Sequence, residues 1–198
     1  MISCGNEGDA WVVELHTNEG VISLEIYARE APSVANSFLR LVESGQLCGA
    51  KFVRMVPGFL VECAVDVTRK YGEFVEEVTG TRLHHTGAGV VSCPRLEEGG
   101  IAGTRFFVML GPQPVLDNKC IVFGRVFSGM QIIEKISRLH FASDNFRLYS
   151  PVEVRRGVVR RLPKDPRPSS STAASVAGAL HVRQRCELGT SLLEGLES

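Results

Sequence analysis

The first thirty residues show the alternation of apolar and polar side chains that is typical of β-strands. Residues 21–27 alternate with a period of two, and the β-rich segment 11–15 precedes them. Asn18, Glu19 and Gly20 lie between the two segments, where turn-forming residues are expected. Two strands separated by so short a polar segment predict a β-hairpin.

The period changes to that of a helix over residues 31–43. This segment has one apolar face, with Pro32 near its start and Gly45 after its end, as is usual at helix boundaries. Residues 129–139 are also amphipathic and carry basic side chains late in the segment. We predict two helices, the first of which would close one end of a β-barrel. Its apolar positions are Val34, Phe38, Leu41 and Val42.

Short strand-like segments fill most of the remaining chain up to residue 162. Gly, Pro and Asp-Asn residues separate them, and many short strands of this kind indicate a closed sheet or a sandwich. The predicted strands are 51–56, 59–65, 89–93, 106–110, 121–126 and 151–162.

Length and composition predict one domain with a tail. With 198 residues and 44% hydrophobic content, the chain can form one core but is short for two domains. After Pro163 the sequence turns to Pro, Lys, Asp and Arg and then to Ser, Thr and Ala. We predict an extension over residues 1–9, a domain over 10–162 and a flexible tail over 163–198. Apolar residues between Leu188 and Leu196 allow one short helix in that tail.

Charge and hydropathy restrict the expected partners. Lys and Arg together number 22, as do Asp and Glu, so the chain lacks the net positive charge that would favour binding to nucleic acid. No apolar stretch reaches the length of a membrane-spanning helix, and the first ten residues lack a secretory signal pattern. The six cysteines include no CxxC pair, which favours reduced thiols. We expect an intracellular protein, cytoplasmic or nuclear, that binds proteins or peptides and neither nucleic acid nor membrane.

One arginine interrupts an apolar strand and is the first candidate for chemistry. Arg54 lies within the run from Phe52 to Leu60, where a charge cannot be buried without a partner. It is therefore either paired internally or exposed in a cleft, and the pattern alone favours the structural role of an ion-pair partner.

The same run carries a resemblance to a known family. Phe-x-Arg-x-x-Pro-Gly-Phe over residues 52–59, Phe-Phe-Val-Met-Leu over 106–110 and Leu-Asp-x-Lys-x-x-Val-Phe-Gly-Arg-Val over 116–126 together resemble the cyclophilins. The resemblance covers about residues 10–162 and is strongest to the short-loop, single-domain cyclophilins of spliceosome-like assemblies. It implies a mainly β fold, a closed antiparallel eight-stranded barrel capped by two α-helices.

The resemblance also implies an activity, peptidyl-prolyl cis-trans isomerisation of X–Pro bonds in protein substrates without a cofactor. Arg54 would be the catalytic residue, donating a hydrogen bond to the prolyl nitrogen. The proline ring would bind in a pocket formed by Phe59, Leu60, Phe107 and Leu116, with Leu60 in place of the family's usual methionine.

Several positions around this cleft depart from the family. Glu62 and Arg105 replace glutamines, Arg95 replaces an asparagine, and Cys120 replaces a histidine, all among the implied substrate-binding residues. Val115 stands where many members carry the tryptophan that contacts cyclosporin, so we expect weak or no cyclosporin binding. Residues 63–65 and the shortened loop after them imply a remodelled cleft wall.

These departures leave two functions open. Glu62 could orient Arg54 through a charge-assisted hydrogen bond, or it could hold the guanidinium away from the substrate and weaken activity. The leading interpretation is an isomerase, and the alternative is a non-catalytic proline-binding or scaffolding module in a larger assembly. Arg95 and Arg105 would favour substrates with an acidic residue beside proline.

Two further signals carry little weight in the sequence. His84 and His85 are adjacent on an extended segment, so their side chains should point to opposite sides, and we expect no metal site. Cys120 follows Lys119, which could lower the thiol pKa, but an ordinary half-buried thiol is the favoured interpretation.

Overall fold

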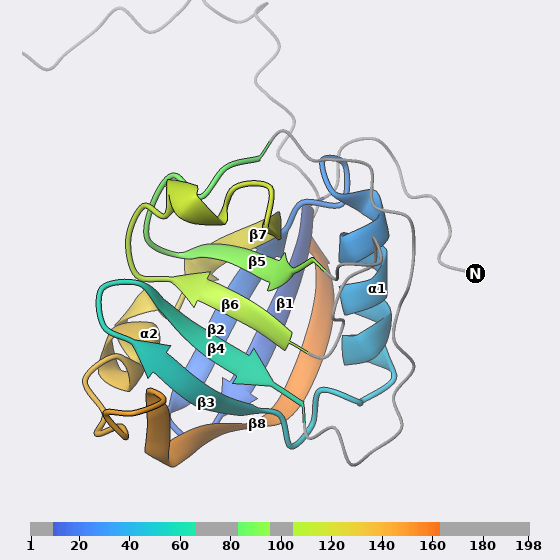
Figure 1. Cartoon of the computed structure of the whole chain (residues 1–198). Helices are drawn as coiled ribbons and strands as arrows, with labels where there is room; N and C mark the ends of the chain where they lie inside the picture. Colours follow the sequence, from blue (N-terminus) through green and yellow to red (C-terminus); the bar gives the residue numbers. More distant parts are fainter. Residues whose placement is uncertain (1–9, 66–82, 96–104, 163–198) are drawn as a thin grey trace, which may run out of the picture. The chain divides into compact units, whose positions relative to one another are not determined.

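The described part of the chain forms a closed β-barrel with two α-helices (Figure 1). This computed structural model describes residues 10–65, 83–95 and 105–162. The predicted tail helix therefore lies outside the described residues. The strands are β1 (Ala10–Thr17), β2 (Gly20–Ile26), β3 (Lys51–Val56), β4 (Leu60–Ala64), β5 (Val90–Pro94), β6 (Arg105–Met109), β7 (Cys120–Ser128) and β8 (Arg147–Leu162). The helices are α1 (Pro32–Glu43), α2 (Met130–Ile136) and the short 3₁₀ helix η1 (Pro114–Leu116).

The strand order confirms the predicted eight-stranded antiparallel barrel. Neighbouring strands follow the order β1-β2-β7-β5-β6-β4-β3-β8, and β8 pairs with β1 to close the sheet. The N-terminal hairpin is present, with Thr17 opposite Gly20 across the turn. Closure pairs both edges of the sheet, so no strand edge of the barrel stays open.

The boundaries of β8 differ most from the prediction. This strand begins at Arg147, four residues before the expected start at Pro151. Its first residue lies opposite Arg54 of β3, and the register then shifts so that Val152 lies opposite Phe52. Pairing with a strand almost a hundred residues away in sequence defines this early start, so periodicity could not reveal it.

Helix α1 packs its apolar face on the barrel core, as predicted. Pro32 occupies the first turn, where its missing N–H costs nothing. The ring of Phe38 lies 5.6 Å from that of Phe106 and 5.1 Å from that of Phe123, measured between centroids. At Gly157 of β8 an added Cβ would lie 2.7 Å from Val42 of α1, so this glycine permits the close approach of helix and strand.

Alternate residues of β4, β5, β6 and β7 point into the barrel and away from it. The inward side chains belong to the main core and include Val61, Cys63, Val91, Cys93, Phe106, Val108, Ile121 and Phe123. The residues between them lie outside that core and so face outward. They include Leu60, Glu62, Ser92, Phe107, Met109 and Val122, of which Leu60, Met109 and Val122 are nevertheless buried. A second, smaller apolar layer therefore covers the outer face of these strands.

The cysteines that the structure describes are unpaired. Cys63 and Cys93 are buried, and burial raises the pKa of the Cys93 thiol to about 12. Both behave as small apolar residues, as expected. Neither described helix combines the length and the apolar character that crossing a membrane requires.

Candidate active site

Strand register brings three of the predicted site residues into one row on the outer face. Arg54 of β3 lies opposite Glu62 of β4, and Glu62 lies opposite Phe107 of β6. Directly opposed residues in antiparallel strands point to the same face and lie within side-chain contact distance. A cation, a carboxylate and an aromatic ring that are far apart in sequence are therefore neighbours.

Arg54 and Glu62 form an ion pair at the centre of this row. Nε of Arg54 lies 3.2 Å from Oε2 of Glu62. Nε of Arg54 is buried and has no hydrogen-bond partner, so its N–H is not directed at that oxygen. The Arg54 side chain stays 44% exposed, whereas that of Glu62 is only 10% exposed. A nearly buried carboxylate therefore contacts a guanidinium that solvent can still reach.

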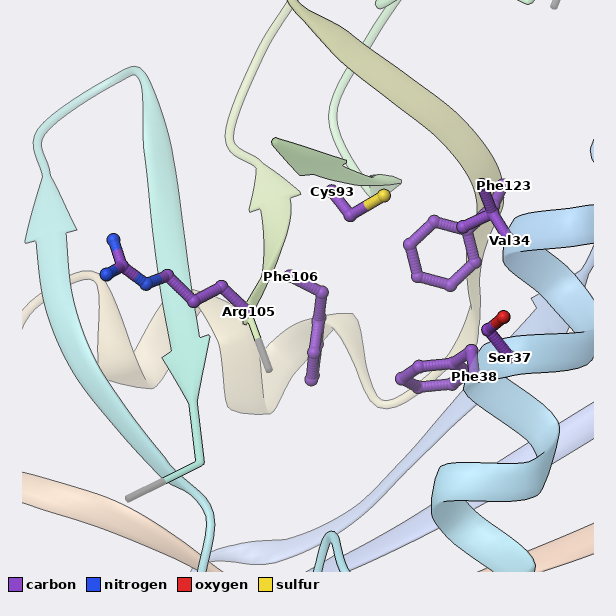
Figure 2. A pocket seen from close by; sticks show the side chains of 7 residues that line it. All are labelled: Val34, Ser37, Phe38, Cys93, Arg105, Phe106 and Phe123. Atoms are coloured by element: carbon purple, nitrogen blue, oxygen red, sulfur yellow. The ribbon is translucent and has the colours of Figure 1, made fainter. Parts of the chain in front are cut away.

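Arg105 approaches the same carboxylate from β6. Its Nη1 lies 3.9 Å from Oε1 of Glu62, a longer and more exposed contact than that of Arg54. Figure 2 shows the Arg105 side chain extending towards β3 and β4, away from the rings of Phe38, Phe106 and Phe123. Glu62 therefore has a cation on each side.

The cavity behind Arg105 is too small to be the substrate site. It is lined mainly by aromatic and aliphatic core side chains, as Figure 2 shows, and its volume is about 10 Å³. That is about the space of one water molecule. The candidate site for a proline ring is therefore the outer face that carries Arg54, Glu62 and Phe107.

Two connecting segments place the remaining pocket residues beside this face. Phe59 lies in the turn between β3 and β4, and its carbonyl accepts a hydrogen bond of 3.0 Å from the N–H of Leu110, which follows β6. The Gln113 side chain donates to the Gly58 carbonyl at 3.1 Å. Gln113 immediately precedes η1, which ends with the half-buried Leu116. Phe59 and Leu116 therefore lie on segments that are bonded to each other.

The two adjacent histidines converge on one carboxylate, and the expectation that they point to opposite sides is wrong. Nδ1 of His85 lies 2.7 Å from Oδ1 of Asp117, and Nδ1 of His84 lies 3.1 Å from Oδ2. Residues 83–86 do not form a strand, and the N–H of Thr86 donates to the His84 carbonyl at 2.9 Å. Hydrogen bonds from the side chain and main chain of His85 lower the pKa of Asp117 to about 2. Within the described ranges, no group of His, Cys, Asp or Glu side chains is arranged to hold a metal ion.

Arg95 and Cys120 lie together at one end of the outer face. Cys120 begins β7 opposite Pro94, and the N–H of Arg95 donates to the Lys119 carbonyl. Cys120 is half-buried, as expected, and burial raises its thiol pKa in spite of the nearby Lys119. The suggestion of an activated thiol is therefore wrong.

Several residues that shape this face were not among the predicted site residues. Gln113 carries no pattern of its own, Asp117 appeared only as part of the motif over residues 116–126, and Arg147 becomes a neighbour of Arg54 only through the β3–β8 pairing. His85 stood out in the sequence, but only as a metal candidate. An isolated polar residue next to a turn has too many potential partners for sequence to choose among them.

The structure is a closed antiparallel β-barrel with an arginine–glutamate–aromatic row on its outer face. The sequence matches the family model described as "Cyclophilin type peptidyl-prolyl cis-trans isomerase/CLD" over residues 12–158. The chain belongs to this family of cyclophilin-type peptidyl-prolyl cis-trans isomerases.

Relatives and solved structures agree with this assignment. The chain is 31% identical over 152 residues to the peptidyl-prolyl cis-trans isomerase ppi1 of Schizosaccharomyces pombe, covering 74% of this chain and 97% of that protein. It is 34% identical over 140 residues to the peptidyl-prolyl cis-trans isomerase-like 1 of Aspergillus niger, covering 67% of this chain and 85% of the relative. A Cryptosporidium parvum cyclophilin, solved in the presence of the dipeptide Ala-Pro, superposes with a TM-score of 0.67 at 19% identity, over 75% of this chain and 98% of that one. This structural likeness supports the fold.

Proposed function

We propose that this chain catalyses cis–trans isomerisation of X–Pro peptide bonds, with Arg54 as the catalytic residue. The observation that carries the proposal is the row of Arg54, Glu62 and Phe107 on the outer face of the barrel. In this row, Glu62 lies between a solvent-accessible guanidinium and an aromatic ring, and Phe59 and Leu116 lie on the neighbouring connecting segments. Family membership and the named isomerase relatives support the same activity.

The chemistry requires only that the amide lose part of its resonance. Partial double-bond character of the C–N bond sets a barrier of ~18–20 kcal/mol to rotation. When the prolyl nitrogen becomes pyramidal, its lone pair leaves conjugation and can accept a hydrogen bond from Arg54. That bond is stronger in the twisted state than in either planar state, so it lowers the barrier. No covalent bond forms or breaks, and no cofactor takes part.

Glu62 supports this role as a positioning residue. Its carboxylate is 10% exposed and contacts Nε of Arg54, while the Arg54 side chain stays 44% exposed. A nearly buried anion in contact with the guanidinium restricts its motion, and the exposed part of the Arg54 side chain stays accessible to a substrate. We therefore favour the orienting role of Glu62 over the inhibitory one.

The test is NMR measurement of cis/trans exchange in Ala-Pro peptides at equilibrium, with the wild-type chain and Arg54→Ala. We expect exchange to be accelerated by the wild type and about 10²-fold less by the variant, the usual effect of losing one such donor. Arg54→Lys is the matched control, because it keeps the charge without the planar donor group. Exchange that is equally fast with Arg54→Ala would contradict the assignment.

We further propose that the substrate carries an acidic residue next to proline. Arg105 is 56% exposed and only 3.9 Å from the already paired Glu62, and Arg95 has a buried Nε without a hydrogen-bond partner. Peptides that differ only by Glu or Lys beside proline should bind with different affinity, and Arg105→Gln should reduce the difference. Equal affinities at low salt would rule this preference out.

The alternative function is a proline-binding or scaffolding module without catalysis, within a larger assembly. It is favoured by the carboxylate at Glu62, because an ion pair competes with substrate for Arg54. Binding of an Ala-Pro peptide without faster exchange would support it.

We also propose weak or no cyclosporin binding. Val115 is 57% exposed, and its side chain offers only an isopropyl group to such a ligand.

A further inference from the structure

Among the His, Asp, Glu, Lys and Arg side chains that the structure describes near the pocket, that of His85 is the most completely buried. Its side chain is 0% exposed, although it lies in a connecting segment before β5, whereas that of His84 is 64% exposed. Buried polar side chains in connecting segments are uncommon unless they bind neighbouring backbone or side-chain groups. The partners of His85 therefore indicate what it holds in place.

His85 binds the residue that follows η1. Its Nδ1 and its main-chain N–H lie 2.7 and 3.0 Å from the same oxygen, Oδ1 of Asp117. A carboxylate can only accept, so Nδ1 carries the proton and donates it. Two donors on the same oxygen, Oδ1, restrict the Asp117 side chain more than a single surface ion pair would.

His85 also binds the residue that precedes η1. Its carbonyl accepts a hydrogen bond of 2.8 Å from the N–H of Gln113. Gln113 and Asp117 are the two residues that flank Pro114–Leu116. One residue thus fixes both ends of the short helix that carries Leu116.

The same segment is fixed to the other wall of the pocket. The Gln113 side chain donates to the carbonyl of Gly58 at 3.1 Å, next to Phe59. Leu116 itself is only half-buried, so its own packing constrains it little. The hydrogen bonds of its neighbours must define its position.

We propose that His85 is a positioning residue of the proline pocket, which holds η1 so that Leu116 stays beside Phe59. The proposal rests on the proposed function for its effect on catalysis, but not for its effect on Leu116. Displacement of a binding group by about 1 Å costs an enzyme up to ~10²-fold in rate, so a segment of this kind needs a fixed support.

The test compares three variants of the full chain, with the Leu116 methyl order parameter measured by NMR. His85→Leu removes the donor, and His85→Asn is smaller than histidine but keeps an amide donor close to the position of Nδ1. His84→Leu is the matched control, because its contact with Asp117 is exposed and of little expected value. We expect Leu116 to become mobile in His85→Leu, to be largely restored in His85→Asn and to be unchanged in His84→Leu.

Peptide kinetics separate positioning from a general loss of stability. In the folded protein, His85→Leu should raise KM for an Ala-Pro peptide about tenfold with kcat within twofold. Adding Leu116→Ala should then have a smaller effect than it has in the wild type, because both changes remove the same contact. The proposal would be overturned if Leu116 were as ordered in His85→Leu as in the wild type, or if the effects of His85→Leu and Leu116→Ala on KM were fully additive.

The two proposals fail in different ways. If the wild type binds the peptide without accelerating exchange, the proposed function fails, and the dissociation constant replaces KM in the same comparison. If it binds no peptide, the Leu116 methyl measurement alone decides. If His85→Leu does not fold, His85→Asn is compared with Asp117→Ala instead. We then expect Leu116 to lose order only in Asp117→Ala.

Discussion

At the residue scale, Glu62 determines how the central arginine behaves. A neutral amide at this position would offer Arg54 an acceptor without a charge, whereas the carboxylate lies 3.2 Å from its Nε and is almost buried. Removing one member of a nearly buried ion pair leaves the other charge without a partner, which usually costs more than losing a surface pair. Glu62 therefore acts directly on the candidate catalytic group.

Replacing Glu62 by glutamine tests this effect with almost no change in volume. We expect kcat/KM for an Ala-Pro peptide to fall about tenfold, equivalent to ~1.4 kcal/mol, because Arg54 loses its orienting anion. The measurement is NMR exchange under the same conditions for both proteins. Arg105→Gln serves as the control, since its contact with Glu62 is longer and should matter less for this uncharged peptide. An increase in activity would instead identify Glu62 as the inhibitory group of the alternative interpretation.

At the element scale, each strand of the site supports two layers. One set of side chains on β4 and β6 fills the barrel, and the alternate set forms the row and the buried Leu60 and Met109. The connecting segments complete the site, because 83–89 and 110–119 are joined through His85, Gln113 and Asp117. Strands thus provide the arginine and the phenylalanine, and connecting segments provide the pocket wall.

The link between these segments should make stability sensitive to acid. The pKa of Asp117 is lowered to about 2, so its contribution is complete above the unfolded value near 4 and is lost as the pH falls through 2. Asp117→Asn should unfold about 1 kcal/mol more easily at pH 7. Its free energy of unfolding should also depend less on pH between 4 and 2.

Urea denaturation across this pH range provides the measurement. Glu14→Gln is the control, because Glu14 also has a lowered pKa but pairs with Arg160 at the surface, far in sequence from the pocket segments. Equal pH slopes for the wild type and Asp117→Asn would show that the His85 bonds do not stabilise the folded state.

At the scale of the whole molecule, barrel closure unites residues from both ends of the described chain. β1 pairs with β8, and β3 pairs with both β4 and β8. Arg54 therefore lies between a strand close to it in sequence and one that closes the fold. The site can form only when the barrel is complete.

A truncation after Leu162 tests the proposed domain of residues 10–162. The described hydrophobic core lies within this range, so we expect the free energy of unfolding to change by no more than about 0.5 kcal/mol. Thermal unfolding followed by circular dichroism, together with exchange of an Ala-Pro peptide, checks stability and activity. A clearly lower melting temperature would mean that residues 163–198 contribute to the folded domain.

The sequence by itself determined the local elements and the family. Period-two segments, the amphipathic helix with Val34 and Phe38, and the motif around Arg54 depend on neighbouring residues, so they can be recognised without coordinates. They predicted the barrel, and the resemblance suggested the candidate residues. The start of β8 at Arg147 and the exposure of Arg54 were not determined in this way.

Tertiary structure alone decided which polar groups meet. The sequence already suggested a contact between Glu62 and Arg54, but the second contact of Glu62 with Arg105, and the convergence of His84 and His85 on Asp117, depend on strand register and on the path of residues 83–86. Register and chain bends result from contacts between segments distant in sequence, and a single polar residue carries no periodic signal of its partner. The physical reason is that long-range packing, and not local pattern, chooses among many potential hydrogen bonds and ion pairs.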